Sequence, residues 1–157
     1  MSYPVKLSES LSLVATIDPN FIAAGGAAVY TDVVNMAEHR RAIVVLLEGP
    51  AVATKRALTA CTLEIFECTA SGTAASTALK STTITRAQTT AAMGQQRVLS
   101  VRDEELGTVH AAYNQYFKAK LTPAAATSAI NFAVVVLAGE SRFSKASEYD
   151  LSTNTIV

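Results

Sequence analysis

The sequence predicts an all-β protein, an antiparallel two-sheet β-sandwich that is jelly-roll-like, with extended N- and C-terminal segments. Six or seven short segments have strand composition, and loops rich in Gly, Pro, Ser and Thr separate them. No helical pattern is longer than about two turns, and a parallel α/β sheet would need long crossover helices. The alanine-rich loops leave room for one or two short helices.

Length and composition support one self-sufficient domain. A chain of 157 residues buries about two thirds of its unfolded surface without help from metals or disulfides. Half of the residues are apolar, yet only 6% are aromatic and none is Trp. We therefore expect a core of small and branched side chains. The expected organisation is an N-terminal arm or peripheral strands over 1–26, the β-sandwich domain over 27–140, and a C-terminal tail or edge strand over 141–157.

The expected strands follow one another along the central domain. In chain order, the segments are residues 27–34, 40–48, 61–69, 79–85, 95–102, 111–122 and 130–138. Between the first two lies NMAEHR, a polar turn with room for one helical turn, and between 95–102 and 111–122 lies RDEELG, a charged turn or single helical turn. Gly49 and Pro50 end the second segment.

Two segments carry continuous apolar runs, HRRAIVVLLEGP from His39 and INFAVVVLAGE from Ile130. A strand with one solvated face alternates apolar and polar residues, whereas a strand buried on both faces does not. Residues 42–47 and 132–137 are therefore predicted to be central strands buried on both faces. Their similarity suggests one such strand in each sheet. Both runs are shorter than the roughly 20 residues that cross a bilayer, and the N-terminus lacks the pattern of a signal peptide.

The remaining strands have distinguishable faces. In CTLEIFECT, Cys61 and Cys68 are seven positions apart, which puts them on opposite faces and roughly 23 Å from each other, too far for a disulfide. We expect both thiols to be small buried hydrophobes. The segment 111–122 is two-faced: one face carries Tyr113, Gln115, Phe117, Ala119 and Leu121, and the other carries Asn114, Tyr116, Lys118 and Lys120.

Residue chemistry argues against catalysis and against a bound cofactor or metal. His39 and His110 are the only histidines, and neither they nor the cysteines have the spacing of zinc ligands. No G-x-S-x-G motif is present, and the acidic run that starts at Asp103 lacks a second carboxylate cluster. We expect no enzyme activity, no cofactor and no metal.

Charge excludes a strongly electrostatic partner. Thirteen basic residues balance thirteen acidic ones, so the whole molecule projects no strong field to steer it toward nucleic acid or anionic lipid. We expect no direct nucleic-acid or membrane partner, and a protein that is made in the cytosol and stays soluble. Apolar residues nevertheless occur in the polar terminal segments, where they either pack on the protein's own core or contact a partner. These candidate contacts are Tyr3, Val5, Leu7, Phe21, Ile22, Phe143, Tyr149, Leu151 and Ile156.

Several segments together resemble those of tailed-bacteriophage head decoration or cement proteins and related small virion structural proteins. They are DVVNMAEHRRAIVVLLEG, QRVLSVRDEELG, NFAVVVLAGESRF and the ending YDLSTNTIV, within residues 30–157. The resemblance implies a homo-oligomeric β-sandwich, a dimer or trimer on the capsid surface that bridges major capsid protein subunits. It brings no catalytic residues with it.

Two other readings of the sequence remain open. A head-tail completion protein or tail structural protein would share the composition and lack of catalytic motifs. A carbohydrate- or ligand-binding β-sandwich would need an exposed aromatic platform, for which Tyr113 or Tyr116 is available in the absence of Trp.

Overall fold

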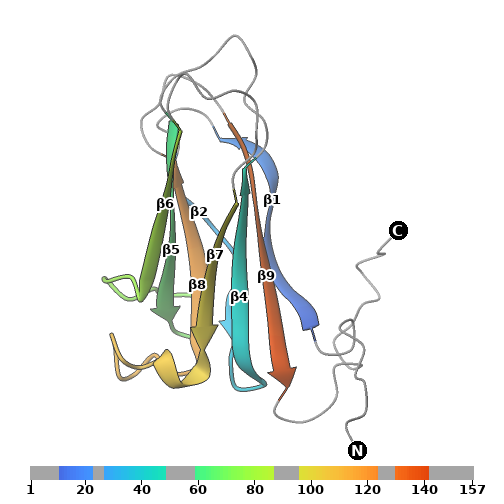
Figure 1. The fold of residues 1–157 in the computed structure, drawn as a ribbon. Coiled ribbons are helices and arrows are strands. Elements are labelled where there is room, and N and C mark those ends of the chain that lie inside the picture. The colour runs from blue at the N-terminus through green and yellow to red at the C-terminus, as the bar shows by residue number, and fades with distance from the viewer. Residues whose placement is uncertain (1–10, 23–26, 49–58, 87–95, 124–129, 142–157) are drawn as a thin grey trace, which may run out of the picture.

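Two antiparallel sheets face each other in the computed structural model, which describes residues 11–22, 27–48, 59–86, 96–123 and 130–141 (Figure 1). The four-stranded sheet has the order β1 (Leu11–Ile22), β9 (Ile130–Ser141), β4 (His39–Glu48) and β7 (Gln96–Arg102). The five-stranded sheet has the order β2 (Val29–Tyr30), β8 (Tyr116–Pro123), β5 (Thr59–Cys68) and β6 (Lys80–Arg86), with β3 (Val34–Asn35) also paired to β8.

The strand pairs are nested as in a jelly roll. The first strand pairs with the last, β2 and β3 both pair with β8, β4 pairs with β7, and β5 pairs with β6. If β2 and β3 are taken as one interrupted strand, this gives two four-stranded sheets in the jelly-roll order. The predicted all-β, two-sheet antiparallel fold is confirmed. In the described ranges the helical structure is the short 3-10 turn η1 (Asp103–Glu105), and no helix there is long and apolar enough to cross a membrane.

The core lies between the sheets and is built from alternate positions of the long strands. Its fully buried members include Val44, Leu46, Leu63, Ile65, Phe117, Leu121, Val134 and Val136. Burying each such side chain contributes about 1.5 to 3 kcal/mol before the entropy cost of ordering the chain. Branched and small residues dominate this core, as the composition predicts.

The prediction that 42–47 and 132–137 are buried on both faces is wrong. Along β4, Val44 is fully buried whereas Val45 is only half-buried and Leu47 is 39% exposed. Val135 on β9 is likewise half-buried between buried neighbours. Both strands are central in their sheet, but one side of that sheet faces the core and no described element lies over the other (Figure 1). The alternation is hidden in the sequence because both sides are apolar.

The expectation of one such strand in each sheet is also wrong. The two runs are neighbours in the four-stranded sheet, with Val45 opposite Val135 and Val44 opposite Val136. Two runs of equal length and matching apolar pattern pair in register because each residue then finds an apolar neighbour across the ladder.

The segment 111–122 forms a shorter strand than predicted. Strand β8 begins at Tyr116, and the residues before it form turns in which the Tyr113 amide donates to the His110 carbonyl at 2.7 Å. Within β8 the two predicted faces are confirmed, since Phe117, Ala119 and Leu121 are fully buried and the lysines point outward.

The terminal segments are described only in part. Residues 11–22 form β1, an edge strand of the four-stranded sheet, and β9 continues to Ser141. Residues 1–10 and 142–157 lie outside the described residues. The boundaries of the arm, domain and tail stay predictions.

Candidate functional site: an apolar outer sheet face

The outer side of the four-stranded sheet carries aliphatic side chains where solvent-facing strands normally carry polar ones. We call this surface the outer apolar face; it consists of Leu13, Ile43, Val45, Leu47, Val98, Ala133, Val135 and Leu137. Three of these side chains are strongly exposed, with Val98 at 57% and Leu13 and Leu47 at 39% each.

Strand register makes this face continuous. In one row across the sheet, Val135 is opposite Val45, and Val45 is opposite Val98. In the next row, Leu137 joins Leu13 on one side and Ile43 on the other. Side chains opposite each other on neighbouring strands are about 5 Å apart, so the rows form one patch across all four strands. Contiguous exposed apolar patches mark sites of interaction in soluble proteins.

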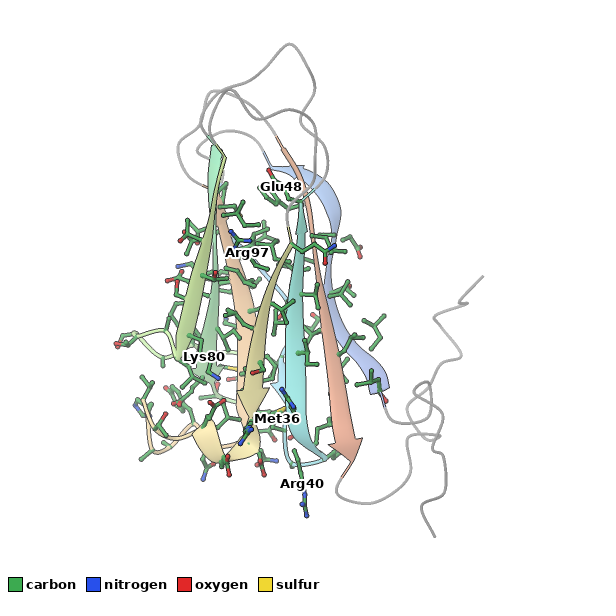
Figure 2. The ribbon with its side chains drawn as sticks, viewed as in Figure 1. Met36, Arg40, Glu48, Lys80 and Arg97 are labelled. Atoms are coloured by element: carbon green, nitrogen blue, oxygen red, sulfur yellow. The ribbon has the colours of Figure 1, made fainter. Side chains whose placement is uncertain are left out.

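Two arginines lie at one end of this face. Arg41 on β4 is opposite Arg102 on β7, and both are exposed. With Arg40, Asp103 and Glu104 they line a shallow hollow, in which Arg102 Nη1 lies 3.2 Å from Glu104 Oε1. Figure 2 shows Arg40 at this end of β4, pointing away from the sheets. The apolar rows therefore have an arginine-rich border at one end.

The outer side of the five-stranded sheet, in contrast, carries charged and polar side chains that bind one another. Lys120 Nζ lies 3.2 Å from Glu64 Oε2, and Thr62 and Thr83 share a hydrogen bond of 3.1 Å. Lys118 lies 4.4 Å from the centre of the Tyr30 ring and donates to the Gly72 carbonyl at 2.6 Å. These polar groups bind one another, and such a surface is well solvated by water. The apolar face is therefore a property of one sheet only.

The predicted terminal contacts cannot be placed on this face. Tyr3, Val5, Leu7, Phe143, Tyr149, Leu151 and Ile156 lie outside the described residues. Phe21 and Ile22 belong to β1 by their backbone, paired with Asn131 and Ile130, and their side chains are outside the described set. These contacts stay a prediction. The face itself was missed by sequence reasoning because its residues on β4 and β9 were assigned to strands buried on both faces, and Leu13 was assigned to the N-terminal arm.

The histidines have structural surroundings. His39 is buried, and desolvation lowers the pKa of its imidazole despite the opposing charge of Glu38. His110 is exposed and its ring stacks on that of Tyr113, with centroids 4.0 Å apart. This stacking occupies one face of the Tyr113 ring.

The acidic groups also act within the fold. Glu105 accepts from Lys80 Nζ at 2.7 Å and from the Arg102 amide at 2.8 Å, so it closes the turn η1. Glu67 is fully buried and accepts from the backbone amides of Val109 and His110 at 3.1 and 2.7 Å. Glu67 thereby holds the loop before β8, a role that no sequence pattern signalled. Among the described residues, no group of three or more His, Cys, Asp or Glu side chains is arranged to hold a metal ion.

Both cysteines are free and buried on β5, as predicted. Burial, followed by the charge of Glu48, raises the pKa of the Cys61 thiol to about 12. Burial raises that of Cys68 to about 11, against the opposing charge of Lys118. Both thiols stay protonated at neutral pH and are poor nucleophiles.

No protein-family model matches the chain, and no curated protein matches it. Among solved structures, a chain of Desmodium yellow mottle tymovirus is 9% identical with a TM-score of 0.44, covering 90% of this chain and 93% of that one. A chain of Broad Bean Stain Virus is 12% identical with a TM-score of 0.43, covering 89% and 92%. A chain of infectious bursal disease virus, Gx strain, is 11% identical with a TM-score of 0.41, covering 87% of this chain and 33% of that one. These TM-scores are below 0.5 and carry no argument about function.

Proposed function

We propose that this protein is a structural virion protein that binds the outside of a phage capsid and cements neighbouring major capsid protein subunits. The observation that carries the proposal is the outer apolar face, a continuous aliphatic surface on one side of a two-sheet scaffold. The resemblance of residues 30–157 to decoration proteins supports a capsid as the partner that this surface serves. A jelly roll alone does not decide function, since the fold serves capsids, lectins and other proteins.

The proposed role is mechanical. A rigid sandwich transmits force between the subunits that it contacts, because a close-packed core deforms little. Individually weak apolar contacts, repeated by the symmetry of a shell, add to a large resistance against opening. The balanced charge of the chain suits an outer surface that does not contact packaged nucleic acid. The terminal apolar residues are the proposed contacts to the capsid protein.

Quantitative mass spectrometry of purified virions tests this proposal. We expect on the order of hundreds of copies per particle, as repetition over a symmetric shell requires. Virions assembled with Val98→Asp should carry fewer copies and release their genome at a lower temperature, because the variant places a carboxylate on the apolar face. Thr83→Asp, on the polar outer side of the other sheet, is the matched control and should be incorporated normally.

The number of copies per virion distinguishes shell decoration from a head-tail or tail role. About a dozen copies or fewer would contradict shell decoration and favour a head-tail completion or tail role, where rings have few subunits. Complete absence from purified virions would contradict a structural virion role.

A further inference from the structure

We infer that the partner on the outer apolar face is a second copy of this chain, packed face to face about a two-fold axis that runs across the strands. The inference rests on the proposed assembly role only in taking the face to be a protein interface. It assigns the occupant and orientation from the size, relief and charge of the face.

The size of the face matches a dimer interface. Strand β4 has 10 residues, all within the span that pairs with β9, from His39 to Glu48. At about 3.3 Å per residue and about 4.8 Å between strands, the 12 residues each of β1 and β9, the 10 of β4 and the 7 of β7 give the whole outer side of this sheet, its arginine end included, roughly 600 Å². Two stacked faces would bury roughly 1,200 Å² in total, which is the lower end for specific interfaces. A single extended peptide would cover only about one strand spacing of that width.

The relief of the face matches another sheet. Outward aliphatic side chains stand at every second position of neighbouring strands, as Ile43, Val45 and Leu47 do on β4. Side chains of this kind interdigitate when two sheets pack at about 10 Å, which is how the two inner faces form the core of this protein. A second copy offers the same relief.

Charge selects the orientation. Arg41 and Arg102 both stand at one end of the face, while the opposite end carries Leu47, Gln96 and, on β1, the exposed Asp18. A two-fold axis along the strands would stack the arginines of both copies, which costs energy in a desolvated contact. An axis across the strands places each arginine end over the end of the other copy that carries Leu47, Gln96 and Asp18, so that the arginines of the two copies are kept apart. A two-fold interface must be self-complementary, because the same surface is used by both copies. The arrangement with the axis across the strands meets this requirement.

Sedimentation of the purified full chain over a concentration series tests the inference. We expect a concentration-dependent dimer for the wild type and a dissociation constant raised roughly 100-fold or more for Val98→Asp, because each dimer would bury two unpaired carboxylates. Thr83→Asp should dimerise as the wild type does. Circular dichroism should be the same for all three proteins, and so should thermal melting at concentrations low enough for the wild type to be monomeric, since both positions are exposed.

Cysteine cross-linking tests the orientation. Val45→Cys lies in the central row of the face, so oxidation should link two copies, whereas Arg41→Cys at the charged end should not form a disulfide. The native thiols are buried and do not interfere. Cross-linking through Arg41→Cys instead would overturn the orientation.

The outcomes separate this inference from the proposed function. A monomer at all concentrations, or a dimer that Val98→Asp leaves intact, overturns the inference. If the chain is monomeric but Val98→Asp still removes it from virions, the face contacts the capsid protein directly and the virion role stands. If the dimer forms as described but the chain is absent from virions, the dimer stands and the virion role falls.

Discussion

At the scale of single residues, the buried polar groups are fixed by local contacts that the sequence does not reveal. Glu67 occurs in an apolar strand and accepts two backbone amides from a loop 42 and 43 positions later. Its strand position can be predicted from CTLEIFECT, but its partners depend on how the loop before β8 folds back. That Cys61 and Cys68 form no disulfide with each other, in contrast, follows from their spacing along one strand.

His39 should make stability fall as the pH drops below neutrality. Burial lowers the pKa of its imidazole, so below about 6.5 the unfolded chain takes up a proton that the folded chain does not. The free energy of unfolding should therefore decrease as the pH falls from about 6.5 toward the folded pKa. Urea unfolding at a series of pH values measures this slope.

The His39→Gln variant is the control for this slope. It keeps a polar side chain of similar size and cannot be protonated, so the slope between pH 6.5 and 5 should be lost. Glu105 has a lowered pKa, because its bonds to Lys80 and Arg102 outweigh burial, and its contribution is lost only at more acidic pH. An unchanged slope in the variant would show that another group is responsible.

At the scale of elements, strands β4 and β9 show what a sequence pattern can and cannot decide. Composition and the absence of helical periodicity predict their extent well, and both are central. Whether their second face is buried was not decidable, because Val44 and Val45 are the same residue type on opposite sides of one strand. The sequence pattern also could not predict that β4 and β9 belong to the same sheet, because their pairing joins residues about ninety positions apart.

The same substitution at two adjacent valines of β4 should lower the stability of the protein by very different amounts. Val44→Asp places an unpaired carboxylate in the core and should prevent folding or cost more than about 4 kcal/mol. Val45→Asp places it on the outer apolar face, where water is available, and should cost about 1 kcal/mol or less in the free protein. Thermal melting by circular dichroism measures both. Equal loss of structure in the two variants would mean that both faces of β4 are covered.

At the scale of the whole molecule, the fold class follows from segment length and loop composition, but the way the two sheets are joined does not. Lys80 at the start of β6 belongs to one sheet; its Nζ donates to the Ser100 carbonyl on β7, in the other sheet, at 2.5 Å and to Glu105 at 2.7 Å. Figure 2 shows Lys80 on the side of β6 that faces β7. This contact, which we call the Lys80 clip, ties the sheets at one corner. Nothing in LKSTTIT or RDEELG indicates it.

Breaking the Lys80 clip should lower stability modestly. Lys80 and Glu105 side chains are 28% and 33% exposed, so water screens the pair, and Lys80→Met should cost about 1 kcal/mol and lower the Tm by about 2 to 4 °C. A double-mutant cycle with Glu105→Gln isolates the pairwise energy. A cycle energy near zero would show that the carbonyl contact, not the ion pair, does the stabilising. High salt should reduce the stability that the ion pair between Lys80 and Glu105 contributes to the wild type.

The position of β4 between β9 and β7 also constrains how the chain reaches this structure. Both neighbours of β4 are made after it, and β9 emerges from the ribosome about eighty residues later than the end of β4. Until then the run AIVVLLE has an unpaired edge and two uncovered apolar sides. Folding is therefore expected to be slow for a domain of this size, with a lag set by synthesis, and the nascent chain depends on chaperones more than the finished one.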